Sequence, residues 1–150
     1  MENTKPIKTV WTEKDFDQMG WHDNKIYAIT FNVNNSEISL DIDYILQWIN
    51  PEKGETDFKF KVAPSTLVFR NIYNLKIDFP ILDNLFIEDI YRNNPSKPKN
   101  AKHIKEQIEY EWTIETGGGD LIFNSVGFKQ VLRKSPILIN KQNIDLIRRE

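Results

Sequence analysis

The stretch that decides the fold spans residues 38–48 and reads ISLDIDYILQW. Apolar side chains occupy every second position of it, from Ile38 to Trp48. Neighbouring side chains of a β-strand point to opposite faces of the sheet, so a period of two indicates a strand with one buried face. The same period places Asp41 and Asp43 on the opposite face, where we expect them to contact solvent.

Strand-like segments continue on both sides of this stretch. Residues 25–33 are separated from it by turn-forming residues, which predicts that the two segments pair as a hairpin. Residues 108–115 alternate again, the glycines 117–119 turn the chain, and residues 121–132 return as a second hairpin. Residues 82–91 fit one face of a helix as well, but their β-prone side chains favour a strand. The remaining strand-like segments are residues 58–62, 66–72 and 73–79.

The other segments complete a predicted fold of one domain over residues 1–150. Thr12 caps a short helix, and Pro64 suits a bulge or a sheet edge. Residues 93–104 predict a flexible loop, and the tail after Pro136 is either a short docked helix or a frayed end. Runs of strands joined by short turns predict a mainly β fold, an antiparallel sandwich or open barrel of about eight strands with one short N-terminal helix.

The composition restricts the classes of function. The chain of 150 residues has no cysteine, so a disulfide framework, a thiol nucleophile and a cysteine-based zinc site are excluded. The sequence shows neither a secretory signal nor an apolar run of membrane-spanning length, which predicts a cytoplasmic protein without a membrane partner. The formal net charge of −2 lacks the basic excess of a nucleic-acid-binding surface, so we expect no nucleic-acid partner. We also expect no cofactor.

The pair His22–Asp23, which follows Trp21, is the first candidate for chemistry. A histidine beside a carboxylate can serve as a general acid or base, or can bind a metal together with His103. A catalytic metal centre usually takes three protein ligands, and His103 lies in the lysine-rich loop, so we expect no metal here. We favour a structural corner, in which Asp23 bonds to backbone N–H groups of a turn and Trp21 fills the end of the core.

Acidic residues alternate with apolar ones on two predicted strands. Asp41 and Asp43 share one face, and Glu109 and Glu111 share another, because residues two apart on a strand point the same way. Cross-strand ion pairs explain such rows, and an exposed acidic face can also dock a basic partner. The candidate binding residues are therefore Trp21, His22, Asp23, Asp41, Asp43, Glu109 and Glu111.

Four stretches carry a resemblance to known proteins. They are W-H-D-x-x-I at residues 21–26, LDIDYILQW at 40–48, VAPSTLVFRNIYNLKI at 62–77, and the pair EYEWTIET and LIFNSVGF within 109–128. Through them, residues 8–133 resemble a set of small bacterial β-rich proteins of unassigned function. Some proteins with a similar H-D-x-x-I opening resemble immunity proteins, which are encoded beside toxin genes and bind the toxin. The resemblance implies a protein partner and brings no catalytic residue to this chain.

These observations lead to three hypotheses. The first is a non-enzymatic binding protein, of which a toxin-neutralising immunity protein is one form. The second is a small-molecule binder with a barrel cavity lined by Tyr44, Trp48 and Trp112. The third is an enzyme centred on His22 and Asp23.

Overall fold

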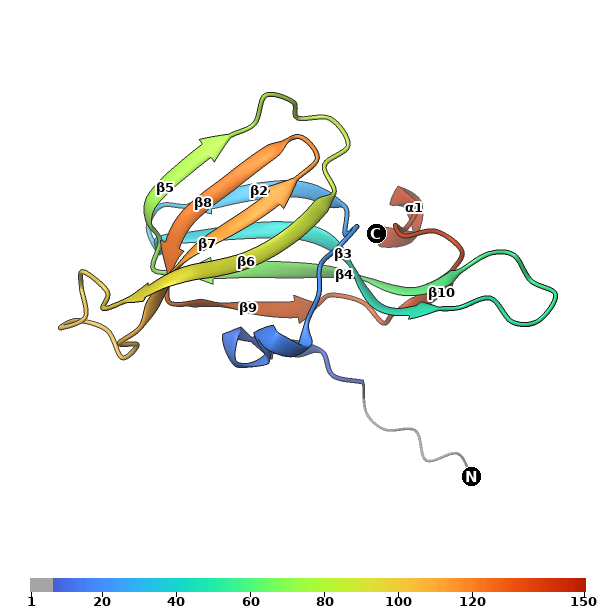
Figure 1. The fold of residues 1–150 in the computed structure, drawn as a ribbon, viewed down its shortest axis with the longest axis horizontal. Coiled ribbons are helices and arrows are strands. Elements are labelled where there is room, and N and C mark those ends of the chain that lie inside the picture. Colours follow the sequence, from blue (N-terminus) through green and yellow to red (C-terminus); the bar gives the residue numbers. More distant parts are fainter. Residues whose placement is uncertain (1–6) are drawn as a thin grey trace.

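The computed structural model describes residues 7–150, which fold into two antiparallel sheets packed as a sandwich (Figure 1). The first sheet consists of β1 (Val10–Thr12), β2 (Ile26–Asn32), β3 (Glu37–Ile49), β4 (Lys59–Arg70), β9 (Gly127–Leu132) and β10 (Ile137–Ile139). The second consists of β5 (Tyr73–Asp78), β6 (Ile87–Ser96), β7 (Glu109–Thr116) and β8 (Gly119–Ser125). The strand orders are β1-β9-β4-β3-β2, with β10 also pairing with β4, and β5-β8-β7-β6. The predicted mainly β sandwich is confirmed.

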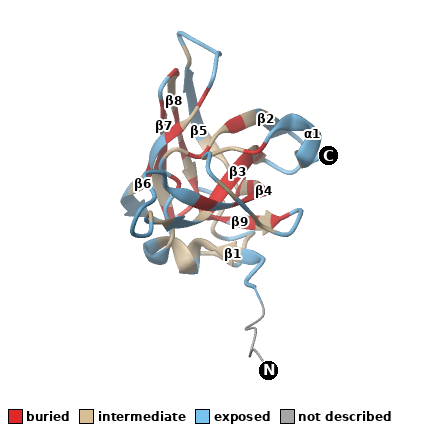
Figure 2. Ribbon diagram, turned by 90° about the vertical axis from the view of Figure 1, so that its right-hand side faces the viewer, coloured by how far each residue is buried: buried red, intermediate tan, exposed pale blue. Residues whose placement is uncertain are grey.

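The strand β3 lies at the centre of the main core, as its alternating sequence predicts. It pairs with β2 on one side and with β4 on the other, in antiparallel register. Leu40 and Ile42 are fully buried and pack against Trp112 and Phe69 in one apolar cluster between the sheets. Figure 2 shows the buried residues concentrated along the strands of the two sheets. Burial of these large side chains is the main favourable contribution to folding.

The alternation fails at the far end of β3. The register with β4 shifts between Ile45 and Gln47, which marks a bulge. An extra residue in one strand reverses which side chains face the core. Trp48 is consequently 46% exposed and packs edge-on against Phe60, so its predicted burial is wrong. Ile45 is buried instead, beneath Ile144 on the outer side of the sheet.

The chain crosses between the two sheets at two neighbouring points. Residues 121–132 form two strands rather than the single predicted one, because the chain leaves β8 at Ser125 and begins β9 at Gly127. Gly127 has a φ of 150°. The Ser125 hydroxyl donates to the carbonyl oxygen of Arg70, at the end of β4, at 2.6 Å. The β4–β5 and β8–β9 crossings are therefore fastened to each other.

Most of the short elements follow the predictions. Residues Glu13–Gln18 form the 3-10 helix η1, and Thr12 and Asp15 form its capping box. Segment 82–91 contributes the first half of β6 and is not a helix. The expected loop at 93–104 begins later, since β6 continues to Ser96. The tail ends in a docked single turn, α1 (Leu146–Arg149).

Pro64 occupies an unexpected place. It lies inside β4, an interior strand of the first sheet, and pairs with Asp43 of β3. On its other side, β10 pairs with residues 60–62 and β9 with residues 65–70, so Pro64 falls between the two partner strands. A residue without a backbone N–H is tolerated at such a gap, which is why neither an edge nor a bulge is needed.

Within residues 7–150, the structure contains no helix that is both long and apolar enough to cross a membrane.

The turn between β7 and β8 gives a test of the fold. Gly119 has a φ of 151°, and a Cβ atom at this position would overlap the carbonyl oxygen of Asp78. Gly119→Ala is expected to lower the free energy of unfolding by about 2 kcal/mol or more, because it combines backbone strain with a steric clash. Gly117→Ala is the matched control, since its Cβ would meet only the Glu88 side chain at 3.9 Å. Urea unfolding of both variants checks this; equal losses would contradict the described turn.

Candidate functional site

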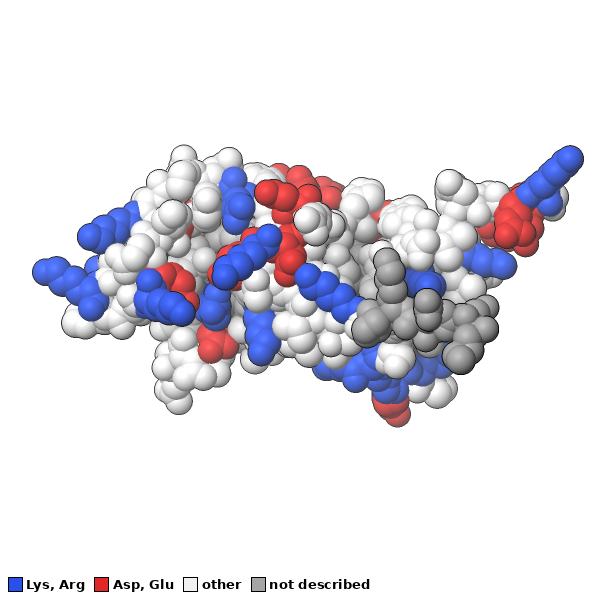
Figure 3. Space-filling view, turned by 90° about the horizontal axis from the view of Figure 1, so that it is seen from below, with Lys and Arg blue, Asp and Glu red and all other residues white. Residues whose placement is uncertain are grey.

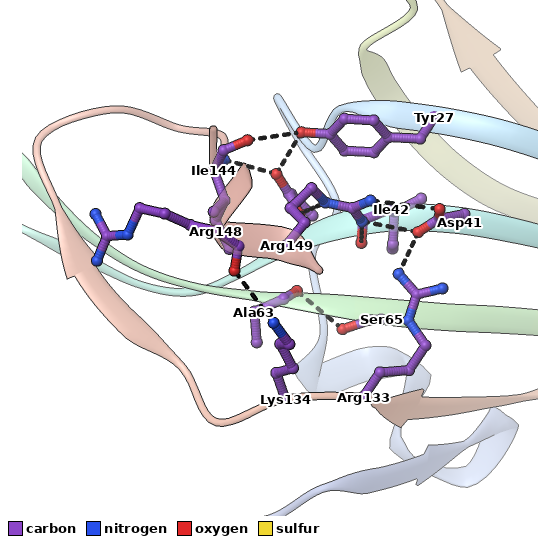
Figure 4. A network of polar contacts seen from close by, with 11 residues as sticks. Tyr27, Asp41, Ile42, Ala63, Ser65, Arg133, Lys134, Ile144, Arg148 and Arg149 are labelled. Carbon is purple, nitrogen blue, oxygen red and sulfur yellow. Dashed lines mark hydrogen bonds and ion pairs between the residues drawn. The ribbon is translucent and has the colours of Figure 1, made fainter. Parts of the chain in front are cut away.

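Asp43 is an acidic residue without any solvent exposure. Three donors surround its carboxylate: the Tyr27 hydroxyl at 2.7 Å, the backbone N–H of Ile144 at 2.7 Å and Nε of Arg149 at 2.8 Å. Tyr27, Ile144 and Arg149 are labelled in Figure 4. These bonds replace the water that the buried charge has lost. The prediction that Asp43 contacts solvent is wrong, because residues 137–149 cover the outer face of β3 at this point.

Arg149 joins Asp43 to Asp41 and to Tyr27. Its Nη2 donates to Asp41 Oδ1 at 2.7 Å and to the carbonyl oxygen of Ile42 at 3.2 Å. The guanidinium carbon lies 3.6 Å from the centroid of the Tyr27 ring, a cation–π contact. Arg133 donates a further hydrogen bond to Asp41. Four groups contact the Arg149 guanidinium in this way, and we call them together the guanidinium site: Tyr27, Asp41, the Ile42 carbonyl and Asp43.

The surroundings of this site set the protonation state of its members. Burial raises the pKa of Tyr27, and the hydrogen bond to Asp43 raises it further. Burial also acts upward on Asp41, but the hydrogen bonds from Arg149 and Arg133 outweigh it and hold the pKa of Asp41 below its usual value. Burial lowers the pKa of Arg149, whereas its bonds to Asp41 and Asp43 raise it, with a net increase. At neutral pH, Tyr27 is therefore neutral, Asp41 is anionic and Arg149 is cationic.

The four acids expected to form binding rows lie on different sheets. Asp41 and Asp43 belong to β3, and Glu109 and Glu111 belong to β7. Glu109 is buried, contrary to its predicted exposure, and its Oε1 accepts a hydrogen bond from Asn124 Nδ2 at 3.1 Å. Glu111 is half-buried. The acids therefore do not form one acidic surface.

His22 and Asp23 lie where the chain connects the two sheets. The backbone N–H of Asp23 donates to Ile87 at the start of β6, at 2.8 Å, and Asp23 has a φ of 65°. Its carboxylate accepts from Gln142 Nε2 at 2.8 Å rather than from the backbone of the turn. The exposed His22 ring donates through Nδ1 to the carbonyl oxygen of Glu88 at 3.1 Å. Within residues 7–150, no three His, Cys, Asp or Glu side chains lie close enough together to hold a metal ion.

Trp21 anchors this corner. Its side chain belongs to the main core, and its Nε1 donates to Gln130 Oε1 in β9 at 2.8 Å. Asn24 Oδ1 accepts from the backbone N–H of Ile45. Residues 21–24 therefore connect to three other strands, β3, β6 and β9, which favours the structural-corner interpretation over a chemical one.

An apolar groove of about 800 Å³ lies on the flank where β2 faces β5 and the segment that follows it. We call it the flank groove. It is lined by β2 and the preceding Lys25, by Ile77 and Phe79, and by Leu82, Asn84 and Leu85. The side chains of Phe31, Ile77 and Leu82 are exposed there. Among residues 7–150, β2 and β5 are terminal strands of their sheets. The start of the outer edge of β2 is occupied by the Lys25–Phe86 bridge and by the bond from the Ile26 N–H to the Leu85 carbonyl oxygen, and beyond Ile26 no described strand pairs with it.

The barrel cavity of the second hypothesis does not form around Tyr44, Trp48 and Trp112. Tyr44 is buried in the main core. Trp112 is fully buried among Phe16, Phe69 and Phe128. Trp48 is exposed at the far end of β3, beyond the bulge. The two sheets pack directly on each other instead of enclosing a lumen that these residues line.

On the face drawn in Figure 3, the charged side chains do not mark a site comparable to the guanidinium site or the flank groove. Lysine and arginine side chains lie there together with aspartate and glutamate side chains. Surface charges of mixed sign that are separated by more than about 10 Å are largely screened at 0.1 M ionic strength.

Loss of the Asp43 charge should destabilise the protein strongly. Asp43→Asn is expected to lower the free energy of unfolding by about 3 kcal/mol, because the Arg149 side chain, 9% exposed, loses one of its two carboxylates, and the Tyr27 hydroxyl and the Ile144 N–H lose a charged acceptor. Asp89→Asn, at an exposed position of β6, is the control and should change it by less than about 0.5 kcal/mol. Urea denaturation of both variants measures the difference; similar losses would contradict the network.

Acid should weaken the same network. The pKa of Asp41 is lower in the folded protein, so the stability it contributes is present above its unfolded pKa of about 3.9 and is lost as the pH falls through the lower, folded value. The free energy of unfolding of the wild type should therefore fall between about pH 5 and pH 2 more steeply than that of Asp41→Asn. Parallel pH profiles of the two proteins would show that Asp41 is not coupled to Arg149 and Arg133.

Comparison with known proteins gives no match for this chain. No family model matches the sequence, and the curated proteins and the solved structures give no significant match. The resemblance to small β-rich proteins and to immunity proteins therefore stays a prediction.

Proposed function

We propose that this protein is a binding domain that holds an extended, apolar segment of another protein in the flank groove. The observation that carries the proposal is the coincidence of exposed apolar side chains with two free strand edges. Phe31, Ile77 and Leu82 are large, apolar and exposed at one place, whereas single exposed apolar residues are ordinary on a protein surface.

The free strand edges give the groove a means of recognition. Because β2 and β5 end their sheets, an incoming segment can add to either edge and form main-chain hydrogen bonds. Alternate side chains of such a segment would point into the groove, and the intervening ones would point to solvent. A volume of about 800 Å³ accommodates several side chains of this kind. The partner chemistry that fits is a strand with every second residue apolar.

The toxin-neutralising role implied by the W-H-D-x-x-I resemblance is one form of this function. An immunity protein acts by binding one protein tightly, and edge pairing in an apolar groove supports that mode of action. The proposed groove is independent of His22 and Asp23, which lie at the sheet-connecting corner.

Peptide selection tests the groove. Random peptides displayed on phage and selected on the wild-type protein are expected to share a period-two apolar pattern. Phe31→Asp and Ile77→Asp should weaken the selected peptides by about tenfold or more, because each places a charge against an apolar ligand. Leu138→Asp is the matched control, since Leu138 is an exposed apolar residue on β10, outside the groove. Equal losses in all three variants would contradict the site.

Backbone methylation then separates strand pairing from other modes of binding. A strand that pairs with one edge directs alternate N–H groups to it, so N-methylation at every second peptide position should abolish binding and methylation between them should not. Tolerance at all positions would contradict edge pairing, even if the peptide occupied the groove.

A further inference from the structure

We infer that the guanidinium site is an arginine receptor, filled by the chain's own Arg149, which an arginine side chain of another molecule can occupy in its place. This inference goes beyond the proposed groove and does not require it, because all contacts of the receptor are made by Tyr27, Asp41, Ile42 and Asp43.

The receptor matches a guanidinium group and not a cation in general. Nε donates to Asp43 Oδ1 at 2.8 Å, and Nη2 and Nη1 donate to the two oxygens of Asp41 at 2.7 Å and 3.4 Å. The Ile42 carbonyl accepts a further bond, and the Tyr27 ring covers one face of the group. A planar fork satisfies two carboxylates and an aromatic face at the same time, whereas the tetrahedral ammonium of lysine cannot.

The receptor is held in shape by groups other than Arg149. Asp43 accepts from the Tyr27 hydroxyl and from the Ile144 backbone, and Asp41 accepts from Arg133 (Figure 4). The single proton of the Tyr27 hydroxyl is shared between Asp43 and the Ile144 carbonyl oxygen, which lies 3.2 Å from the hydroxyl oxygen. Withdrawal of Arg149 would therefore leave two oriented carboxylates beside an aromatic ring, a preorganised site for another guanidinium.

Apart from Arg149, the segment that delivers it is attached by exposed contacts: Lys134 Nζ donates to the Arg148 carbonyl oxygen at 3.3 Å, and Lys141 lies 3.6 Å from the Asp145 carboxylate. Leu146 is 66% exposed and Ile147 is 86% exposed, and the Asp145 side chain does not cap the single turn α1. Ile144 is buried and marks the point up to which the tail is packed. Residues 145–149 can consequently swing out about Ile144, and an incoming arginine remakes most of what their departure breaks.

Because Arg149 is part of the chain, its covalent tether determines how tightly another molecule must bind the guanidinium site to displace it. A ligand tethered by a short flexible segment has an effective concentration of the order of millimolar, so free arginine should compete poorly with Arg149 in the wild type. A partner with additional contacts can prevail, and Tyr27 lies on β2, the strand that also lines the flank groove. Removing the internal competitor should expose the receptor to small probes.

Rescue of Arg149 variants by an arginine probe tests the inference. Arg149→Ala should be less stable than the wild type, and N-acetyl-arginine amide should raise its unfolding temperature in a saturable manner. N-acetyl-lysine amide should bind about tenfold more weakly, because it lacks the planar fork. If Arg149→Ala fails to fold, Arg149→Lys provides the same test, with probe binding followed by the NMR signals of the Tyr27 ring.

The control is the double variant Asp43→Asn/Arg149→Lys, which lacks the buried carboxylate and should bind neither probe. Equal responses to the arginine and lysine probes, an unchanged response in the double variant, or no response of either single variant would overturn the inference. None of these variants alters Phe31 or Ile77, so failure of the receptor and failure of the groove are distinguishable.

Discussion

The buried carboxylate of Asp43 is the constraint on which the outer half of this structure depends. A carboxylate without solvent exposure needs hydrogen-bond donors in place of water. Tyr27 of β2 supplies one, and the Ile144 N–H and Arg149, both of one distant segment, supply the others. The segment around Ile144 and Arg149 is consequently held on β3, where Ile144 covers Ile45 and Phe60. One buried charge thus organises both a second apolar cluster and the docking of the tail.

The fold could be predicted from the sequence because its central patterns are strictly periodic. The period of two over residues 38–44 and in the second half of residues 108–115 corresponds to the buried faces of β3 and β7, and both predicted hairpins form. Prediction failed where a single residue changes the register or the sheet. The bulge after Ile45 exposes Trp48, and Gly127 divides one expected strand between two sheets.

For the candidate site, the sequence predicted the strand face on which Asp43 lies but not its burial. Alternation tells on which face of a strand a side chain lies, but not what covers that face. Asp43 was placed on the correct face, yet its cover comes from residues about a hundred positions further along the chain. The buried Glu109 illustrates the same limit. The flank groove had a signal in Ile77 and Phe79, apolar residues of a predicted strand-like segment, but the sequence does not tell that β5 ends its sheet.

The strand β2 links the two proposed recognition features. Its outer edge and Phe31 contribute to the flank groove, while Tyr27 covers the guanidinium in the site on the outer face of the first sheet. The two proposals involve different means of selecting a partner: the groove would contribute affinity through buried apolar area, and the guanidinium site would discriminate between arginine and lysine.

The attachment of residues 144–149 to β3 depends on direct coupling between Asp43 and Arg149, and a double-mutant cycle measures this coupling. The free energy of unfolding would be determined for the wild type, Asp43→Asn, Arg149→Ala and the double variant. A buried, hydrogen-bonded pair at 2.8 Å predicts a coupling energy of about 2 kcal/mol or more. Strictly additive losses, with a coupling energy within about 0.5 kcal/mol of zero, would show that the tail is held by something else and would contradict the account.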